Sequence, residues 1–260
     1  MPAPENVVHA YGVVETAAEL TLPPAGINGA PVTRSACGEY TVISSSHAES
    51  ELGAAIWEER GQDPHWIGSI AAEHHAVLQA LVDQVDILPL RLPGIYLDER
   101  SMCEALTVSH GELRAVFETI RGHVEWGVQI FSRAVEARPP VQPRPTSGRD
   151  YLRMRTEHTA QQVADRERRN AVLLGVHESL ALAATRATLN PPRDRALTGR
   201  SEEMLFNGAY LVARNGQERF FEIVKEQAES HDPEGYLLEL SGPWPPYNFT
   251  DTPMHSTGTT

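Results

Sequence analysis

The sequence predicts an α+β fold in two domains, and three observations support that prediction. Helical and strand patterns follow one another without the strict alternation of a doubly wound sheet, which favours segregated helices and strands. The chain has 260 residues, enough for one large domain or two smaller ones. Residues 138–145 hold four prolines, which cannot continue a helix or a central strand.

We therefore expect four parts. An N-terminal α+β domain covers residues 1–138, and a proline-rich linker covers 139–147. A second α+β domain with a long helix covers 148–240, followed by a proline- and aromatic-rich tail at 241–260. Charge differs between the halves: residues 1–138 hold 19 acidic and 8 basic residues, whereas the remainder holds 16 and 14.

Strand and turn patterns alternate with helix signals along the first domain. Capping boxes are expected to start helices at Ser46, Ser101 and Ser109, and Asp63-Pro64 is typical of an N-cap followed by a proline at the first helical position. The expected elements are a strand at 7–14, a hairpin of 31–37 and 40–44 around Gly38-Glu39, a helix from Ser46 to about Arg60, a helix from Pro64 with Trp66, Ile70, His74, Val77, Leu81 and Val85 on one face, an edge or irregular strand at 87–96, and a closing strand at 124–133.

The second domain is expected to begin with a long helix, with a solvated arginine-rich front half and a core-packed rear half. Asn190-Pro191-Pro192 stops this helix. The expected elements are a helix at about 148–189, a strand at 203–213, a short helix capped at Asn215 with Phe220, Phe221 and Val224 inward, and a strand at 236–240. This order fits a sheet with helices on one face.

The composition excludes several classes of function. A net charge of −13 argues against nucleic acid or an anionic membrane as the main partner. The longest uncharged run, residues 20–33, is short and interrupted by prolines and glycines, so we expect no transmembrane helix. The N-terminus lacks signal-peptide features, so we expect a cytoplasmic protein in which Cys37 and Cys103 are free thiols.

No local motif for catalysis or cofactor binding is present. The glycine-rich phosphate loops, the nucleophile elbow and the common zinc spacings are all missing from the sequence. His74 and His75 point about 100° apart on a helix, so they do not share a ligand site, and a core or boundary role is favoured. We therefore name no catalytic residue, no cofactor site and no metal ligand, although many active sites have no local motif and the missing motifs do not by themselves exclude an enzyme.

Two charged residues stand in unusual places. Arg91 lies in the apolar, proline-marked segment 88–94, and Glu125 begins another apolar strand. A structural ion pair between them is the favoured interpretation. The alternative is an arginine directed at the carboxylate of a partner.

The tail carries three aromatic residues in a backbone fixed by prolines. Trp244, Tyr247 and Phe249 offer a large apolar area at low entropy cost. Such a segment either docks on its own domain, which we favour, or anchors another protein.

These segments resemble the gas vesicle protein F/L family. The shared pieces run in the family's order from about residue 8 to residue 250, and the tail motif is the most specific of them. They are Tyr11-Gly12-Val13-Val14, Trp66, His74, Leu88-Pro89-Leu90-Arg91, Glu125-Trp126-Gly127-Val128, Gly148-Arg149-Asp150-Tyr151-Leu152, Asn207-Gly208-Ala209-Tyr210-Leu211-Val212 and Ser241-Gly242-Pro243-Trp244-Pro245-Pro246-Tyr247-Asn248-Phe249. One departure is Leu92-Pro93-Gly94, where the family usually has an aromatic residue and glycine, and it leaves the local geometry open.

The resemblance implies a non-enzymatic role in the gas vesicle. Family members are described as minor vesicle components or assembly factors that bind the small hydrophobic shell protein of the GvpA type, limit its aggregation and help nucleate the vesicle. The implied fold is two α+β domains, the second a modified ferredoxin-like one. The implied partners are the shell protein and other gas vesicle accessory proteins, with no nucleic acid or membrane.

The expected partner-binding residues are Arg91, Glu125, Trp244, Tyr247 and Phe249. We expect the contact to be partly electrostatic, between the acidic first domain and basic residues of the shell protein. Two alternatives stay open at this point. One is a small-ligand-sensing α+β module without catalysis, since such sheets often hold effectors. The other is a hydrolase or metalloenzyme with dispersed site residues.

Overall fold

The structure, a computed structural model, describes residues 6–133, 147–195 and 199–250. They form two compact units. The first unit contains the chain up to Glu125 together with the residues from Gly242 onward, and the second contains Trp126 to Ser241. The fold is therefore α+β, as predicted, but the division of the chain differs from the expected boundary at the prolines.

The first unit is built on an antiparallel sheet around strand β1. The sheet has the order β2-β3-β1-β4, and β5 also pairs with β1. The expected strand at 7–14 and the hairpin are confirmed, and segment 87–96 forms only two short pieces. The bounds are β1 Asn6–Glu15, β2 Thr33–Cys37, β3 Tyr40–Ala48, β4 Leu88–Pro89 and β5 Ile95–Tyr96.

A bulge in β1 decides which side chains enter which core. The register against β3 shifts between Ala10 and Gly12, so Tyr11 is the extra residue. Ala10 and Val13 enter a core beneath α4 and α5, whereas Tyr11 and Val14 enter a second core beneath α3. Both faces of the sheet are thus covered by helices. The helix bounds are α1 Glu49–Leu52, α2 Ala54–Arg60, α3 Pro64–Gln79, α4 Glu99–Val108 and α5 His110–Ile120, with a 3₁₀ turn η1 at Ile27–Gly29.

The capping signals predicted some helix starts and not others. Asp63 caps α3 by accepting from the N–H of His65 at 2.9 Å, as expected. The predicted start at Ser46 is wrong, because Ser46 pairs with Val8 in β3 and the helix begins at Glu49. The cap of α4 is Asp98, which forms a capping box with Ser101, so the predicted box was displaced by three residues. Ser109 does stand at the N-cap of α5, but without a side-chain hydrogen bond.

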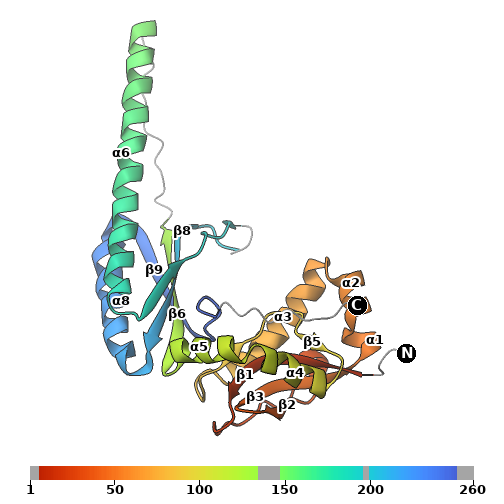
Figure 1. The fold of residues 1–260 in the computed structure, drawn as a ribbon. Helices are drawn as coiled ribbons and strands as arrows, with labels where there is room; N and C mark the ends of the chain where they lie inside the picture. Colours follow the sequence, from red (N-terminus) through yellow and green to blue (C-terminus); the bar gives the residue numbers. More distant parts are fainter. Residues whose placement is uncertain (1–5, 134–146, 196–198, 251–260) are drawn as a thin grey trace. The chain divides into compact units, whose positions relative to one another are not determined.

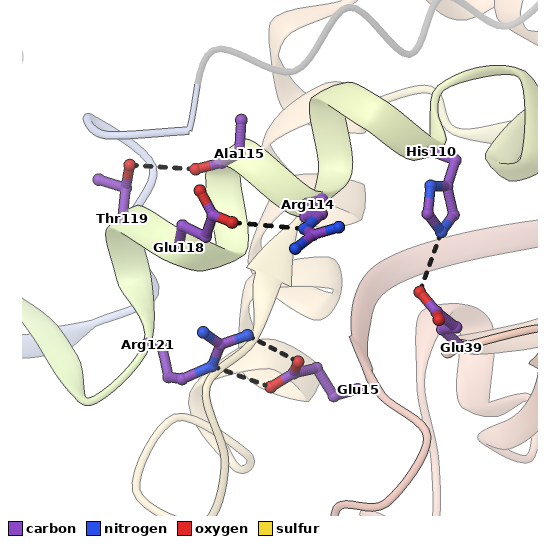
Figure 2. A network of polar contacts seen from close by, with 8 residues as sticks. All are labelled: Glu15, Glu39, His110, Arg114, Ala115, Glu118, Thr119 and Arg121. Carbon is purple, nitrogen blue, oxygen red and sulfur yellow. Dashed lines mark hydrogen bonds and ion pairs between the residues drawn. The ribbon is translucent and has the colours of Figure 1, made fainter.

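Helix α5 is tied to the strand ends by charged side chains (Figure 2). Arg121 pairs with Glu15 at 2.9 Å, and His110 Nε2 lies 3.0 Å from Glu39 Oε2. All four side chains are largely exposed, so each contact contributes little to stability. They link the two ends of α5 to the end of β1 and to the turn between β2 and β3.

The segment from Leu90 to Gly94 keeps its backbone hydrogen bonds to β1 on both sides of Pro93. The N–H of Leu90 donates to Tyr11 O at 2.9 Å, and the N–H of Ala10 donates to Gly94 O at 2.9 Å. Gly94 has φ +54°, and a Cβ there would lie 2.9 Å from Ala10 O. Leu92-Pro93-Gly94, which departs from the family pattern, therefore ends in a glycine because the backbone here lies too close to β1 for a side chain.

Three buried histidines, His9, His47 and His74, lie between the sheet and α3, and the contact of His9 with His74 joins the two elements. His74 Nε2 lies 3.0 Å from Leu90 O and must donate to it, which leaves His74 Nδ1 to accept from His9 Nε2 at 2.9 Å. On the same side, Tyr11 OH contacts Ser45 Oγ at 2.7 Å, and Ser45 Oγ contacts His47 Nε2 at 2.7 Å. Burial lowers the pKa of all three histidines, that of His74 to about 4.

The two cysteines are paired, contrary to the expected free thiols. Cys37 at the end of β2 and Cys103 in α4 form a disulfide with a Cα–Cα distance of 5.1 Å. The two residues lie 66 positions apart, so no spacing in the sequence predicts the pairing.

The second unit holds a four-stranded sheet with the order β7-β8-β6-β9. The strand expected to close the first domain, 124–133, is β6 of this sheet, and that prediction is corrected. Helices α6 and α8 both contact β8 and each other, so they cover one face as predicted. The elements are β6 His123–Ser132, α6 Gly148–Ala181, β7 Arg186–Leu189, β8 Glu203–Ala213, η2 Arg214–Gly216, α8 Gln217–His231, η3 Asp232–Glu234 and β9 Tyr236–Trp244.

The order β–α–β–β–α–β in this unit is compatible with the ferredoxin-like fold, which stays a prediction. The long helix ends at Ala181, and the residues expected to complete it form β7, which pairs with β8. Its rear half is packed through Val176 and Leu180, while the front half is exposed and extends past the sheet (Figure 1). The expected linker lies almost wholly outside the described residues.

We predict that His74 makes the fold sensitive to acid. Between pH 4 and 6.5 the unfolded chain binds more protons at this site than the folded chain, so stability is complete above pH 6.5 and falls as the pH drops through the folded pKa. Over this pH range the free energy of unfolding in urea is expected to fall less for His74→Gln than for the wild type, by up to about 3 kcal/mol.

The control is His65→Gln, an exposed histidine at the start of α3, which should keep the wild-type pH dependence. If the free energy of unfolding depends on pH equally in the wild type and in His74→Gln, the acid sensitivity does not come from His74.

Candidate functional site

The carboxylate of Glu125 receives the end of the C-terminal segment, defined here as residues 242–250. The backbone N–H of Asn248 donates to Oε2 at 2.9 Å, and Asn248 Nδ2 donates to Oε1 at 2.6 Å. Glu125 is only 3% exposed. One buried carboxylate therefore holds both the backbone and the side chain of Asn248.

Burial raises the pKa of Glu125 to about 7, although the two hydrogen bonds from Asn248 act in the opposite direction. The folded chain thus binds a proton more readily here than the unfolded chain does. The contribution of this shift to stability is complete below about pH 4.5 and is lost as the pH rises through 7.

Helix α3 provides the second wall of the site. Gln79 Nε2 donates to Pro243 O at 2.8 Å, and His75 Nδ1 lies 3.2 Å from Tyr247 OH. The ring of Trp244 lies 5.3 Å from the ring of His75. His75 and Gln79 are four residues apart and share a helix face, whereas His74 points into the sheet. The two adjacent histidines therefore serve different sides of the helix, as the sequence predicted.

The C-terminal segment is folded by its own short-range hydrogen bonds. The N–H of Tyr247 donates to Pro245 O at 2.7 Å, and Pro246 O accepts from the N–H of Phe249 and from Thr250 Oγ1, both at 3.0 Å. Pro245, Pro246, Phe249 and Thr250 are buried, and Tyr247 packs against the core beneath α3. The segment is thus an integral part of the first unit.

The structure brings together four of the five residues expected to bind a partner. Glu125, Trp244, Tyr247 and Phe249 meet at this site, and the segment docks within the chain as favoured, but on the first unit. Arg91 is exposed, whereas Glu125 is buried and its carboxylate accepts from Asn248, so the structure does not show the expected ion pair between the two. Sequence reasoning missed Asn248, His75 and Gln79, because no local pattern links residues 123 or more positions apart.

A second polar surface lies at the outer end of β1. A cavity of about 690 Å³ is lined there by Glu15, Glu39, Tyr40, Arg114 and Arg121, and Figure 2 shows the charged side chains around it. Among the described residues, no group of three or more His, Cys, Asp or Glu side chains could hold a metal ion. No helix within the described ranges is long and apolar enough to cross a membrane.

Comparison with known proteins identifies the family. The model of the gas vesicle synthesis protein GvpL/GvpF family matches residues 7–251. The chain belongs to this family. Gas vesicle protein L of a Streptomyces species is 31% identical over 229 residues, covering 86% of this chain and 85% of its own length. Gas vesicle protein F2 of Halobacterium salinarum is 24% identical over 250 residues, covering 95% and 93%.

Two crystal structures of GvpF share the fold. The protein from Anabaena superposes with a TM-score of 0.71 at 16% identity, covering 95% of this chain and 97% of its own. The protein from Microcystis aeruginosa has a TM-score of 0.67 at 17% identity, covering 95% and 99%. The GvpL/GvpF family membership thus places the chain among gas vesicle proteins, and these likenesses place it in the GvpF fold.

We predict that Glu125→Ala loosens the C-terminal segment. The substitution leaves the two donors of Asn248 without their acceptor and opens a cavity, at a cost of about 2 kcal/mol in unfolding free energy. Chymotrypsin, which cleaves after aromatic residues that are not followed by proline, should then cut after Tyr247 or Phe249 in the folded protein.

The matched control is Glu118→Ala, which removes an exposed carboxylate that faces Arg114 on α5. Unchanged proteolysis and stability in Glu125→Ala would show that the segment is held by other contacts.

Proposed function

We propose that this chain is a minor gas vesicle component or assembly factor that binds the hydrophobic shell protein. By covering apolar surface on that protein it limits aggregation and helps to nucleate the vesicle. The observation that supports the proposal is the family match across residues 7–251, which spans both units. The proposal assigns binding and no catalytic step to the chain.

The distribution of charge supports an acidic contact surface. The first unit contains 19 acidic and 6 basic residues, a net charge of −13, whereas the second contains 16 of each. The entire net charge of the protein therefore belongs to the first unit. Such a surface attracts basic groups of a partner and repels other copies of the same protein.

Apolar side chains are exposed within this acidic surface. Leu97, just before α4, is 65% exposed, and Val108 at its end is 88% exposed, with the exposed acids Glu99 and Glu104 between them. Exposed Arg91 lies on the segment that leads to this helix. A shell subunit with apolar surface and basic side chains would find both kinds of contact here.

The five residues expected to bind a partner divide into two roles under this proposal. Arg91 and half-buried Trp244 are placed to touch the shell protein directly. Glu125, Tyr247 and Phe249 act indirectly, because they hold the C-terminal segment against α3. Other gas vesicle accessory proteins remain further candidate partners.

We predict that capture of purified shell protein by the full chain weakens severalfold between about 50 mM and about 500 mM salt, because screening shortens the range of surface charges to a few ångströms. Arg91→Ala should also weaken capture, because the Arg91 guanidinium is expected to pair with a carboxylate of the shell protein and not with its basic groups. Arg100→Ala removes a similarly exposed arginine, one that pairs with Glu104, and serves as its control.

Equal capture at both salt concentrations would exclude the electrostatic part of the contact. No capture at either concentration, by a sample whose circular dichroism shows it to be folded, would contradict shell binding itself.

A further inference from the structure

The second unit contains a cleft of about 860 Å³ lined by arginines. Arg166 and Arg169 come from α6, and Arg193 and Arg195 come from the loop after β7. The acidic lining residues are Asp194 and Glu203. Four guanidinium groups against two carboxylates make this cleft basic in a protein whose overall charge is −13.

The cleft has an ordered frame. Arg166, Arg169 and Leu173 lie on one face of α6, because they are three and four residues apart. The loop is held to β8 by hydrogen bonds: the N–H of Asn190 donates to Asn207 O at 2.8 Å, and Asn207 Nδ2 donates to Pro191 O at 3.4 Å. These bonds hold the start of the loop against β8, and the N–H of Arg193 donates to Met204 Sδ at 3.2 Å.

Three of the four arginines that line the cleft form no ion pair with a described residue. Among the described residues, the side chains of Arg166, Arg169 and Arg193 form no ion pair, whereas Arg168 beside them pairs with Asp165 at 3.2 Å. An arginine fork binds carboxylates through two parallel hydrogen bonds, so converging guanidinium groups favour an acidic partner.

Apolar side chains complete the lining. Leu173, Met204 and Leu205 contribute to the cleft, and Met204 is buried. A small inorganic anion would make no use of these groups. Single-stranded nucleic acid usually stacks on aromatic side chains, and none of the residues that line the described cleft is aromatic. The basic and apolar lining groups together fit a partner segment in which carboxylates flank an apolar side chain.

We propose that this cleft is a docking site for an acidic, amphipathic segment of a partner protein. The site is separate from the acidic surface of the first unit and opposite to it in charge, so it goes beyond the contact proposed above. The chain would then carry two surfaces for two chemically different partners. A basic apolar partner would bind the first unit and an acidic segment would bind the second.

The test uses the full chain and three synthetic peptides of equal length. The first carries glutamates and leucines, the second replaces the glutamates with glutamine, and the third replaces the leucines with serine. Calorimetry should show salt-sensitive binding of the first peptide only. The double variant Arg166→Gln with Arg169→Gln should bind it about tenfold more weakly.

The matched control is Arg153→Gln with Arg155→Gln, two exposed arginines of the same helix outside the cleft, which should bind like the wild type. Absence of peptide binding, or equal loss in both double variants, would overturn the proposal.

Two further arms separate the other possible occupants. If tripolyphosphate binds as tightly as the acidic peptide, or if the serine peptide binds as tightly as the leucine peptide, the cleft is a general anion site and the proposal is overturned. Sedimentation equilibrium tests for a second copy of the chain. Salt-sensitive dimers that disappear in the cleft variant, without peptide binding, would assign the cleft to self-association and overturn it as well.

Discussion

The contact between Glu125 and Asn248 determines how the chain is divided. Because the carboxylate at the head of β6 accepts from both the backbone and the side chain of Asn248, the C-terminal segment completes the first unit. The first unit is thus made from both ends of the described chain, and the second is inserted between them. A truncation after residue 138 would remove the C-terminal segment of the first unit and would leave β6 as the only strand of the second sheet.

Much of the local structure could be predicted from the sequence. Strand β8 begins and ends at the predicted residues, and the Asp63 cap starts α3 as expected, because both depend on neighbouring residues. Predictions failed where pairing across the chain decided the outcome. Ser46 is held in β3 by its partner Val8, and the strand beginning near Val124 joins the second sheet.

The candidate site shows the same limit. Glu125, Trp244, Tyr247 and Phe249 could be singled out because a charge in an apolar strand and aromatics among prolines are unusual patterns. Their arrangement could not be predicted, since the favoured partner of Glu125 was an arginine rather than an asparagine amide. Likewise, the charge imbalance was visible in the sequence, but its confinement to one unit depends on where the chain divides.

Hydrogen–deuterium exchange of the full chain tests most directly whether the C-terminal segment belongs to the first unit. The amides of Asn248 and Phe249 donate to Glu125 and Pro246, so they should exchange as slowly as the amides of β1. Exchange of residues 244–250 at the rate of an unfolded peptide, while β1 stays protected, would contradict the account of how this protein is built.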